Sequence, residues 1–218
     1  MIQTDSPKDK RWVKTRGKLV RAGFELLGRH GIGAVGVDEI AAQAGIAKQT
    51  FYNHFIDRDA FLLDLRRESR EIFEQIVTRI NAEVESPTDR LAQGVAVHAR
   101  MAILDPLHAR FFANVAAMTF TEEQALNVGL ITDLEAGRQR GEFAFGSIEA
   151  AVTLTGAVTQ VTVAQLLELK HAQLAVPVTQ EMLTMLLRGL GVQPDRAEQR
   201  ASRMTNRIFF LEPAILAP

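Results

Sequence analysis

Apolar residues recur at the three- and four-residue spacing of amphipathic helices along most of this 218-residue chain, and no stretch alternates with period two long enough to predict a strand. In residues 13–29, for example, Val20, Phe24 and Leu27 fall on one stripe, and Gly31 behind them suits the left-handed end of a helix. The pattern therefore predicts an all-α fold.

Further helices are expected along the rest of the chain, separated by short breaks. A long amphipathic helix is predicted over residues 57–84, with Asp57 as its N-cap, and it is expected to connect two modules. Pro87 and Pro106 suit helix starts, and the two glycines of GRQRGEF mark a break. The other helices are predicted at residues 37–44, 48–55, 88–104, 106–118, 121–140, 147–169, 178–190 and 195–207.

The composition excludes several classes of protein. The chain has no cysteine, so it can form neither a disulfide framework nor a thiolate metal site, which fits a reducing cytoplasm. The N-terminus is charged and has no apolar run behind it, which argues against a secretory signal peptide. Residues 150–167 carry no charge and are long enough to raise the question of a membrane span. Their threonines and glutamines favour a buried packing helix, so we expect a cytoplasmic protein without membrane contact.

Charge is distributed unevenly, although the net charge is only -1. Residues 1–60 hold ten Lys and Arg against seven Asp and Glu, whereas the remaining residues hold fifteen against nineteen. Residues 8–29 alone contain eight basic side chains and two acidic ones. This asymmetry indicates a basic N-terminal module on a mildly acidic body, which suits nucleic acid. An ordinary solvated helix face would carry the same run of charges, so the charge pattern alone leaves both alternatives open.

The spacing of apolar and small residues in residues 36–55 is that of a helix-turn-helix. Ala41 has to be small because the second helix crosses close to it, and Gly45 supplies the positive φ of the turn. Bulky apolar side chains fill the angle between the two helices. The predicted helix-turn-helix core consists of Ile40, Ala41, Gly45, Ile46, Phe51 and Phe55.

The second of these helices presents a polar face opposite its two phenylalanines. Amides bond bidentately to adenine edges and a threonine methyl packs on thymine, so Gln49, Thr50 and Asn53 are predicted to read bases. Lys48, Tyr52 and His54 lie on the flanks and are predicted to bond phosphates, together with the helix N-terminus. A half-buried rim tyrosine and an ordinary surface histidine are the alternatives for Tyr52 and His54.

The segment VDEIAAQAGIAKQTFYNHFIDRDAFL resembles the DNA-binding domain of the TetR family of bacterial transcriptional regulators. The resemblance covers residues 13–73, which it implies to be the DNA-binding domain. It implies that residues 74–218 form an effector-binding and dimerisation domain, where LEAGRQRGEF and MLLRGLGV are also similar to the family. Arg58 stands where the family has a lysine that holds the DNA backbone, so a backbone contact is expected from it.

Three positions depart from the family pattern. Gly36 stands where the family has a threonine that caps the first helix of the motif, and Ala47 stands where it has a capping serine or threonine. Glycine still caps acceptably, whereas alanine does not. Gln49 replaces a common glycine, which predicts a base contact that relatives lack.

The resemblance implies a homodimeric repressor that binds a palindromic double-stranded DNA operator and responds to an unidentified small-molecule effector. The helices at 147–169 and 178–190 are expected to pair with their copies in the second subunit. The effector pocket is expected among the C-terminal helices, with His98, Phe111, Phe112 and Asn114 as candidate lining residues.

Other classes of function are less well supported by the residues. No carboxylate or second histidine lies at catalytic reach on the face that carries His54, so we expect neither an enzyme nor a bound cofactor. Glu168 and His171 have the i, i+3 spacing of a di-iron ligand pair, but a di-iron site needs two such pairs. The nearest second pair, Asp105 and His108, straddles Pro106 at a helix break, so no metal site is expected. The alternative to a regulator is a helical-bundle small-molecule-binding protein or enzyme whose N-terminal helices serve only packing.

Overall fold

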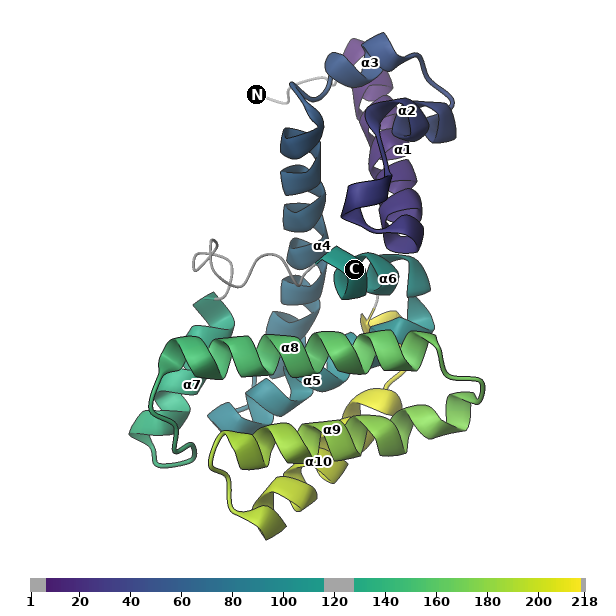
Figure 1. Cartoon of the computed structure of the whole chain (residues 1–218). Helices are drawn as coiled ribbons and strands as arrows, with labels where there is room; N and C mark the ends of the chain where they lie inside the picture. Colours follow the sequence, from purple (N-terminus) through teal and green to yellow (C-terminus); the bar gives the residue numbers. More distant parts are fainter. Residues whose placement is uncertain (1–6, 116–127, 217–218) are drawn as a thin grey trace.

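The structure is a computed structural model of the chain that describes residues 7–115 and 128–216. Every regular element in these two ranges is a helix, which confirms the predicted all-α fold (Figure 1). A small group of helices lies at one end of the molecule and a larger group at the other, with one long helix running from the first to the second. We call the first group the head and the second the body.

The head is formed by the first helices of the chain, which pack around one apolar core. Phe24, Phe51 and Phe61 are each almost completely buried in it, with Leu19 and Leu27 beside them. The helices of the head are α1 (Pro7–His30), the 3-10 helix η1 (Ile32–Ala34), α2 (Val37–Ala44) and α3 (Lys48–Tyr52).

The long helix α4 (Arg58–Asn81) belongs to both groups. Asp57 caps it as predicted, since its carboxylate accepts a hydrogen bond from the Ala60 amide at 2.7 Å. Phe61 and Leu65 in its first half lie in the core of the head, whereas Phe73 and Ile76 in its second half lie in a core of the body. The helix therefore links the position of the head directly to the packing of the body.

The body is built around α5, which packs against α4, α6, α7, α8, α9 and α10. In Figure 1, α8 and α9 run side by side across the body, and they also contact each other. The helices of the body are α5 (Pro87–Leu104), α6 (Pro106–Val115), α7 (Val128–Gln139), α8 (Ile148–Leu167), η4 (Ala172–Leu174), α9 (Ala175–Gly189), α10 (Pro194–Phe209) and η5 (Pro213–Leu216).

The α8 helix is the one span in the described residues that is long and apolar enough to cross a membrane by length and composition. Its threonines and Gln160 make hydrogen bonds inside the body: Thr155 and Thr159 donate to carbonyls one turn earlier, and Gln160 donates to the Ala113 carbonyl at 2.6 Å. It also packs against α5, α6, α7 and α9. These contacts are those of a packing helix in a helical body.

Several helix boundaries differ from those predicted, most of them by one to three residues. The first helix begins at Pro7 rather than residue 13, and α9 begins at Ala175 rather than residue 178. The α3 helix ends at Tyr52, although it was predicted to reach residue 55, because the chain turns there toward Asp57. The predicted end at residue 118 and the predicted start at residue 121 lie outside the described residues.

Head and body meet at a second place besides α4, where the end of α1 crosses α6. A Cβ atom on Gly28 would lie 3.3 Å from both the Arg110 Cβ and the Phe111 amide nitrogen, so only glycine fits this crossing without a shift. Asn114 Nδ2 donates a hydrogen bond to the Gly28 carbonyl at 2.5 Å. The ring of Phe111 packs edge-on against Phe24, with centroids 4.8 Å apart. The α6 helix is therefore attached to the head by packing and by a hydrogen bond.

Candidate DNA-binding surface

The turn between α2 and α3 has the backbone geometry that a helix-turn-helix requires. Gly45 lies in the left-handed region at φ 66° and ψ 40°, and its amide bonds the Ala42 carbonyl at 3.0 Å. The Ile46 amide bonds the Ala41 carbonyl at 3.0 Å. An L-residue with a side chain is strained at this φ, so the sharp turn depends on glycine.

The apolar residues of the motif lie between the helices. Ile40, Ala41 and Phe51 are buried, Ile46 packs at the edge of the same core, and Phe55 is 7% exposed. The Phe51 ring packs against Phe55 and Phe61, with centroids 5.5 and 5.3 Å away. These contacts hold α3 at a fixed angle to the other helices of the head.

The opposite face of α3 is open to solvent. Gln49, Tyr52 and Asn53 are exposed and Thr50 is half-buried, so all three predicted base readers reach the surface of the head. The helix lies at the end of the molecule remote from the body (Figure 1). A DNA major groove can therefore approach it without contact with α5 to α10.

The flanking residues differ in how freely they can reach a phosphate. The Lys48 ammonium lies 2.9 Å from an Asp38 carboxylate oxygen, and this hydrogen bond raises the pKa of Lys48, which stays charged. Burial, and then the nearby charge of Arg16, lowers the pKa of His54. The His54 ring lies against Trp12, with centroids 4.8 Å apart. The lowered pKa favours the uncharged form of His54, so its predicted phosphate contact is expected from a neutral imidazole.

Two of the three departures from the family pattern, Gly36 and Ala47, have visible consequences at the helix starts. At α2, the Glu39 carboxylate accepts a hydrogen bond from the Gly36 amide at 2.7 Å, so this helix start has a side-chain partner without a threonine. At α3, Ala47 is the N-cap and provides no side-chain bond. The Thr50 amide bonds the Ala47 carbonyl at 2.8 Å, which leaves the amides of Lys48 and Gln49 to an anion such as a DNA phosphate.

Arg58 has a structural role that its sequence position did not indicate. Its Nε donates to the Val35 carbonyl at 2.8 Å, and its terminal nitrogen donates to the Ile32 carbonyl. The guanidinium therefore ties the start of α4 to the loop before α2. The contact of Arg58 with the DNA backbone stays a prediction. It would use the guanidinium N–H groups that do not bond the two carbonyls.

Replacing Arg58 by alanine is expected to destabilise the head by about 1–3 kcal/mol, because two carbonyl acceptors lose a charged donor. The Arg58→Lys variant keeps the charge but cannot span both carbonyls with one planar fork. We expect urea unfolding to report a loss of stability for both variants. If the lysine variant is as stable as the wild type, the two hydrogen bonds to carbonyls contribute little to stability, and only the positive charge at this position matters.

The four candidate effector residues fall into two separate groups. His98 lies inside the body, where its ring stacks on Phe73 with centroids 4.4 Å apart and an interplanar angle of 9°. The Phe112 ring lies 5.0 Å from His98 and completes an aromatic cluster of Phe73, His98 and Phe112. Phe111 and Asn114 instead contact the head at Phe24 and Gly28. Phe73 was missed by the sequence analysis, because only the crossing of α4 and α5 brings it beside His98.

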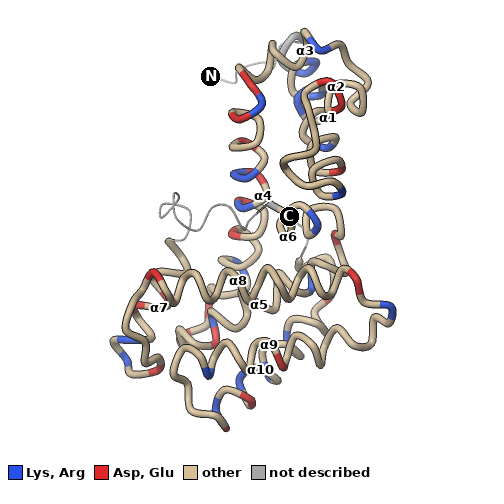
Figure 2. Tube along the Cα trace, viewed as in Figure 1, with Lys and Arg blue, Asp and Glu red and all other residues tan. Residues whose placement is uncertain are grey.

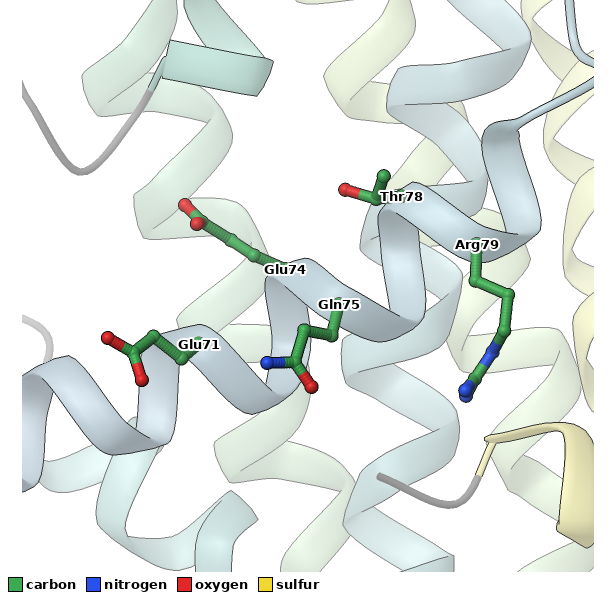
Figure 3. Close-up of a pocket in the computed structure, with 5 residues that line it drawn as sticks. All are labelled: Glu71, Glu74, Gln75, Thr78 and Arg79. Atoms are coloured by element: carbon green, nitrogen blue, oxygen red, sulfur yellow. The ribbon is translucent and has the colours of Figure 1, made fainter. Parts of the chain in front are cut away.

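Two recesses lie on the surface near these residues. One of about 610 Å³ separates the end of α1 from α6 and α8, and Asn114 is among its lining residues together with Arg29, Arg110 and Glu168. The other, of about 410 Å³, lies along α4, and Figure 3 shows that all five of its lining side chains come from that one helix. These side chains are Glu71, Glu74, Gln75, Thr78 and Arg79. Effector pockets are mostly enclosed by apolar side chains that come from several helices. The aromatic cluster has these two properties to a greater degree than either recess.

Acid is expected to destabilise the body through His98. Burial lowers the pKa of His98 from 6.5 to about 4, despite its hydrogen bond to the Gly94 carbonyl. Between these values the unfolded chain binds a proton that the folded chain does not, so stability falls as the pH drops from about 6.5 to about 4. At about pH 5 these two pKa values correspond to a loss of about 2 kcal/mol. Urea unfolding at about pH 7.5 and about pH 5 should show a smaller pH effect in His98→Phe than in the wild type; an equal effect in both would contradict the assignment.

The packing of the head and the α2–α3 turn define a helix-turn-helix of the kind that DNA-binding proteins use. Residues 19–65 match the family model described as "Bacterial regulatory proteins, tetR family". The match covers most of the head and the first two turns of α4, so this part of the chain is similar to the DNA-binding module of TetR-type bacterial regulators.

The curated relatives are similar over about half of their length. An uncharacterized HTH-type transcriptional regulator of Mycobacterium tuberculosis strain H37Rv, Rv1255c, is 28% identical over 113 residues, which are 51% of this chain and 55% of the relative. A second such regulator, MT1294 of strain CDC 1551, matches to the same extent.

Solved structures extend the similarity of fold to most of the chain. RolR without ligand is 25% identical and covers 86% of this chain and 97% of its own, with a TM-score of 0.62. RolR in complex with resorcinol is 24% identical and covers 89% of this chain and 96% of its own, with a TM-score of 0.64. A gamma-butyrolactone receptor is 17% identical over 91% of this chain and 99% of its own, also with a TM-score of 0.64. The similarity of fold to these structures therefore extends beyond the head to the body.

Proposed function

We propose that this protein is a cytoplasmic, ligand-responsive repressor that binds a palindromic operator as a homodimer. The observation that carries the proposal is the exposed polar face of α3, where Gln49, Thr50 and Asn53 lie on a helix held by a left-handed turn at the far end of the head. One such helix contacts too few base pairs for useful specificity, so two copies about 34 Å apart are needed. The DNA-binding domain is taken as residues 13–73 and the effector-binding and dimerisation domain as residues 74–218.

The effector is proposed to bind in the body at the aromatic cluster of Phe73, His98 and Phe112. Two of these residues lie where α4 and α5 cross, so a small molecule that separates the rings displaces the lower half of α4. RolR has been solved with resorcinol, an aromatic molecule, which supports a flat ligand for a cluster of stacked rings. Displacement of α4 is proposed to change the distance between the two α3 helices and to weaken DNA binding. An unchanged distance between the α3 helices in crystals with and without inducer would contradict this.

A gel-shift experiment tests the DNA-binding part. The full-length protein is mixed with the intergenic DNA upstream of its own coding sequence, at rising salt. Phosphate neutralisation predicts a linear fall in log affinity against log salt, with a steep negative slope. If the folded dimer fails to retard this DNA at low salt, the protein is better described as a helical-bundle small-molecule-binding protein.

A further inference from the structure

The first three turns of α1 project beyond the core of the head. Leu19 is the first residue of the helix that lies in the core. Before it, two side chains attach the helix to its neighbours: Arg16 pairs with Asp64 and Glu68 of α4, and Trp12 lies against His54 after α3. The Trp12 ring nevertheless remains 48% exposed. The projecting turns, residues 7–18, are thus held beside the candidate recognition helix without being part of the core.

Four cations line the other side of these turns. Lys10, Arg11, Lys14 and Lys18 are all exposed. At about 100° per residue they fall within a stripe roughly 100° wide, on the side of the helix opposite Trp12 and Arg16. Figure 2 shows lysine and arginine repeated along α1. We call Lys10, Arg11, Lys14 and Lys18 the α1 basic stripe.

The α1 basic stripe differs from the charged face of α4 and from the later turns of α1. On α4, arginines pair with acids three or four residues away, as Arg67 does with Asp64 and Arg70 with Glu74. On α1 itself, Arg21 pairs with Glu25. Among residues 10–114 and 128–216, whose side chains the structure describes, no acid forms an ion pair with any member of the stripe. A face that only serves solubility gains from such pairs, so an uncompensated row of cations indicates an anionic partner.

The position of the stripe identifies that partner. The contact between Trp12 and His54 places the start of α1 at the same end of the head as α3. A helix rises by about 1.5 Å per residue, so Lys10 to Lys18 covers about 12 Å along the axis, which is enough to reach several phosphates of one DNA strand. A duplex whose major groove receives α3 therefore brings its backbone to the start of the stripe.

We propose that the first three turns of α1 form a second DNA contact, in which Lys10, Arg11 and Lys14 bind backbone phosphates beside the groove that α3 enters. This proposal rests on the proposed DNA-binding function. Trp12 is a positioning residue, because its contact with His54 holds the cations in register with α3. The contact adds affinity for any sequence and leaves base selection to Gln49, Thr50 and Asn53.

The salt dependence of operator binding tests the stripe. In the triple variant Lys10→Gln, Arg11→Gln, Lys14→Gln, a dimer loses six phosphate contacts, so the slope of log affinity against log salt should become shallower by about 5. The matched control is Lys170→Gln, Arg196→Gln, Arg207→Gln, which removes the same charge from exposed positions in the body. We expect the control to keep the wild-type slope.

The possible results distinguish a failure of the proposed stripe contact from a failure of the proposed DNA-binding function. Equal slopes in the two triple variants, with operator binding intact, would overturn the proposal and leave the proposed function standing. No operator binding by the wild-type protein would instead remove the proposed function, and the stripe with it. The positioning role of Trp12 predicts a shallower slope for Trp12→Ala and a restored slope for Trp12→Phe, with unchanged base preference in both. A wild-type slope in Trp12→Ala would contradict that role.

Discussion

Replacing Met185 by aspartate is expected to convert the dimer into monomers and to lower operator affinity by at least about 100-fold. Met185 is 53% exposed in the single chain, in the middle of α9. In the proposed dimer it is covered by the second copy, so the variant buries an unpaired carboxylate from each subunit. The cost of about 3 kcal/mol or more corresponds to a 100-fold loss.

The surface around Met185 has the composition of an interface between identical subunits. Val161 of α8 is 56% exposed and Leu154 is 37% exposed, so an apolar surface extends from α9 onto the uncharged helix beside it. Glu181 and Arg188 lie one turn to either side of Met185 on α9. If a two-fold axis passes near Met185, Glu181 of each subunit can lie beside Arg188 of the other. These two opposite-charge contacts favour an isologous pairing.

Sedimentation velocity measures the oligomeric state, and a gel shift measures operator affinity. The control is Phe210→Asp, which places the same charge on a residue that is 79% exposed at the end of α10. We expect the control to remain dimeric. A dimeric Met185→Asp protein with full operator affinity would show that the two subunits meet elsewhere.

Gln49→Ala and Asn53→Ala are expected to relax base preference at one position of each half-site, at a cost of about 1–3 kcal/mol per half-site on the preferred sequence. Both side chains are exposed on α3, and neither takes part in the core of the head. Each variant should therefore fold normally while binding altered operators almost as well as the original one.

Lys48→Ala provides the contrast, because a phosphate contact contributes equally to every sequence. Affinities for a set of operators with single base changes distinguish the two roles. The lysine variant should weaken binding to all of them by a similar factor, whereas the amide variants should flatten the differences among them. If all three variants behave alike, the assignment of Gln49 and Asn53 to bases is wrong.

The local parts of the structure could be predicted from spacing. The limits of α2 and the capping by Asp57 follow from residues within one or two turns of each other, and so does the left-handed turn at Gly45. Such features depend on backbone geometry and short-range packing, which recur wherever the spacing recurs.

Contacts between distant elements could not be predicted in the same way. Arg58 bonds carbonyls of residues 32 and 35, and nothing in its neighbouring sequence indicates that those acceptors are within reach. Phe111 and Phe112 are adjacent in sequence, yet one packs into the head and the other beside His98. Consecutive residues of a helix point in directions about 100° apart, so the neighbours of α6 decide their roles. The sequence pattern identified these aromatic residues and left their partners open.

The bond from Asn114 to the Gly28 carbonyl gives the head a second attachment to the body, besides α4. A rigid piece joined to another at a single point can swing in any direction, whereas one joined at two points can only turn about the line between them. The head is joined to the body both by α4 and by the crossing of α1 with α6. In the proposed switch, we expect a displacement of α4 relative to α6 to turn the head about the line between its two attachments. In the proposed symmetric dimer, both α3 helices would then turn through the same angle. The binding of one ligand in each subunit would therefore change the angle at which the two helices enter the major groove.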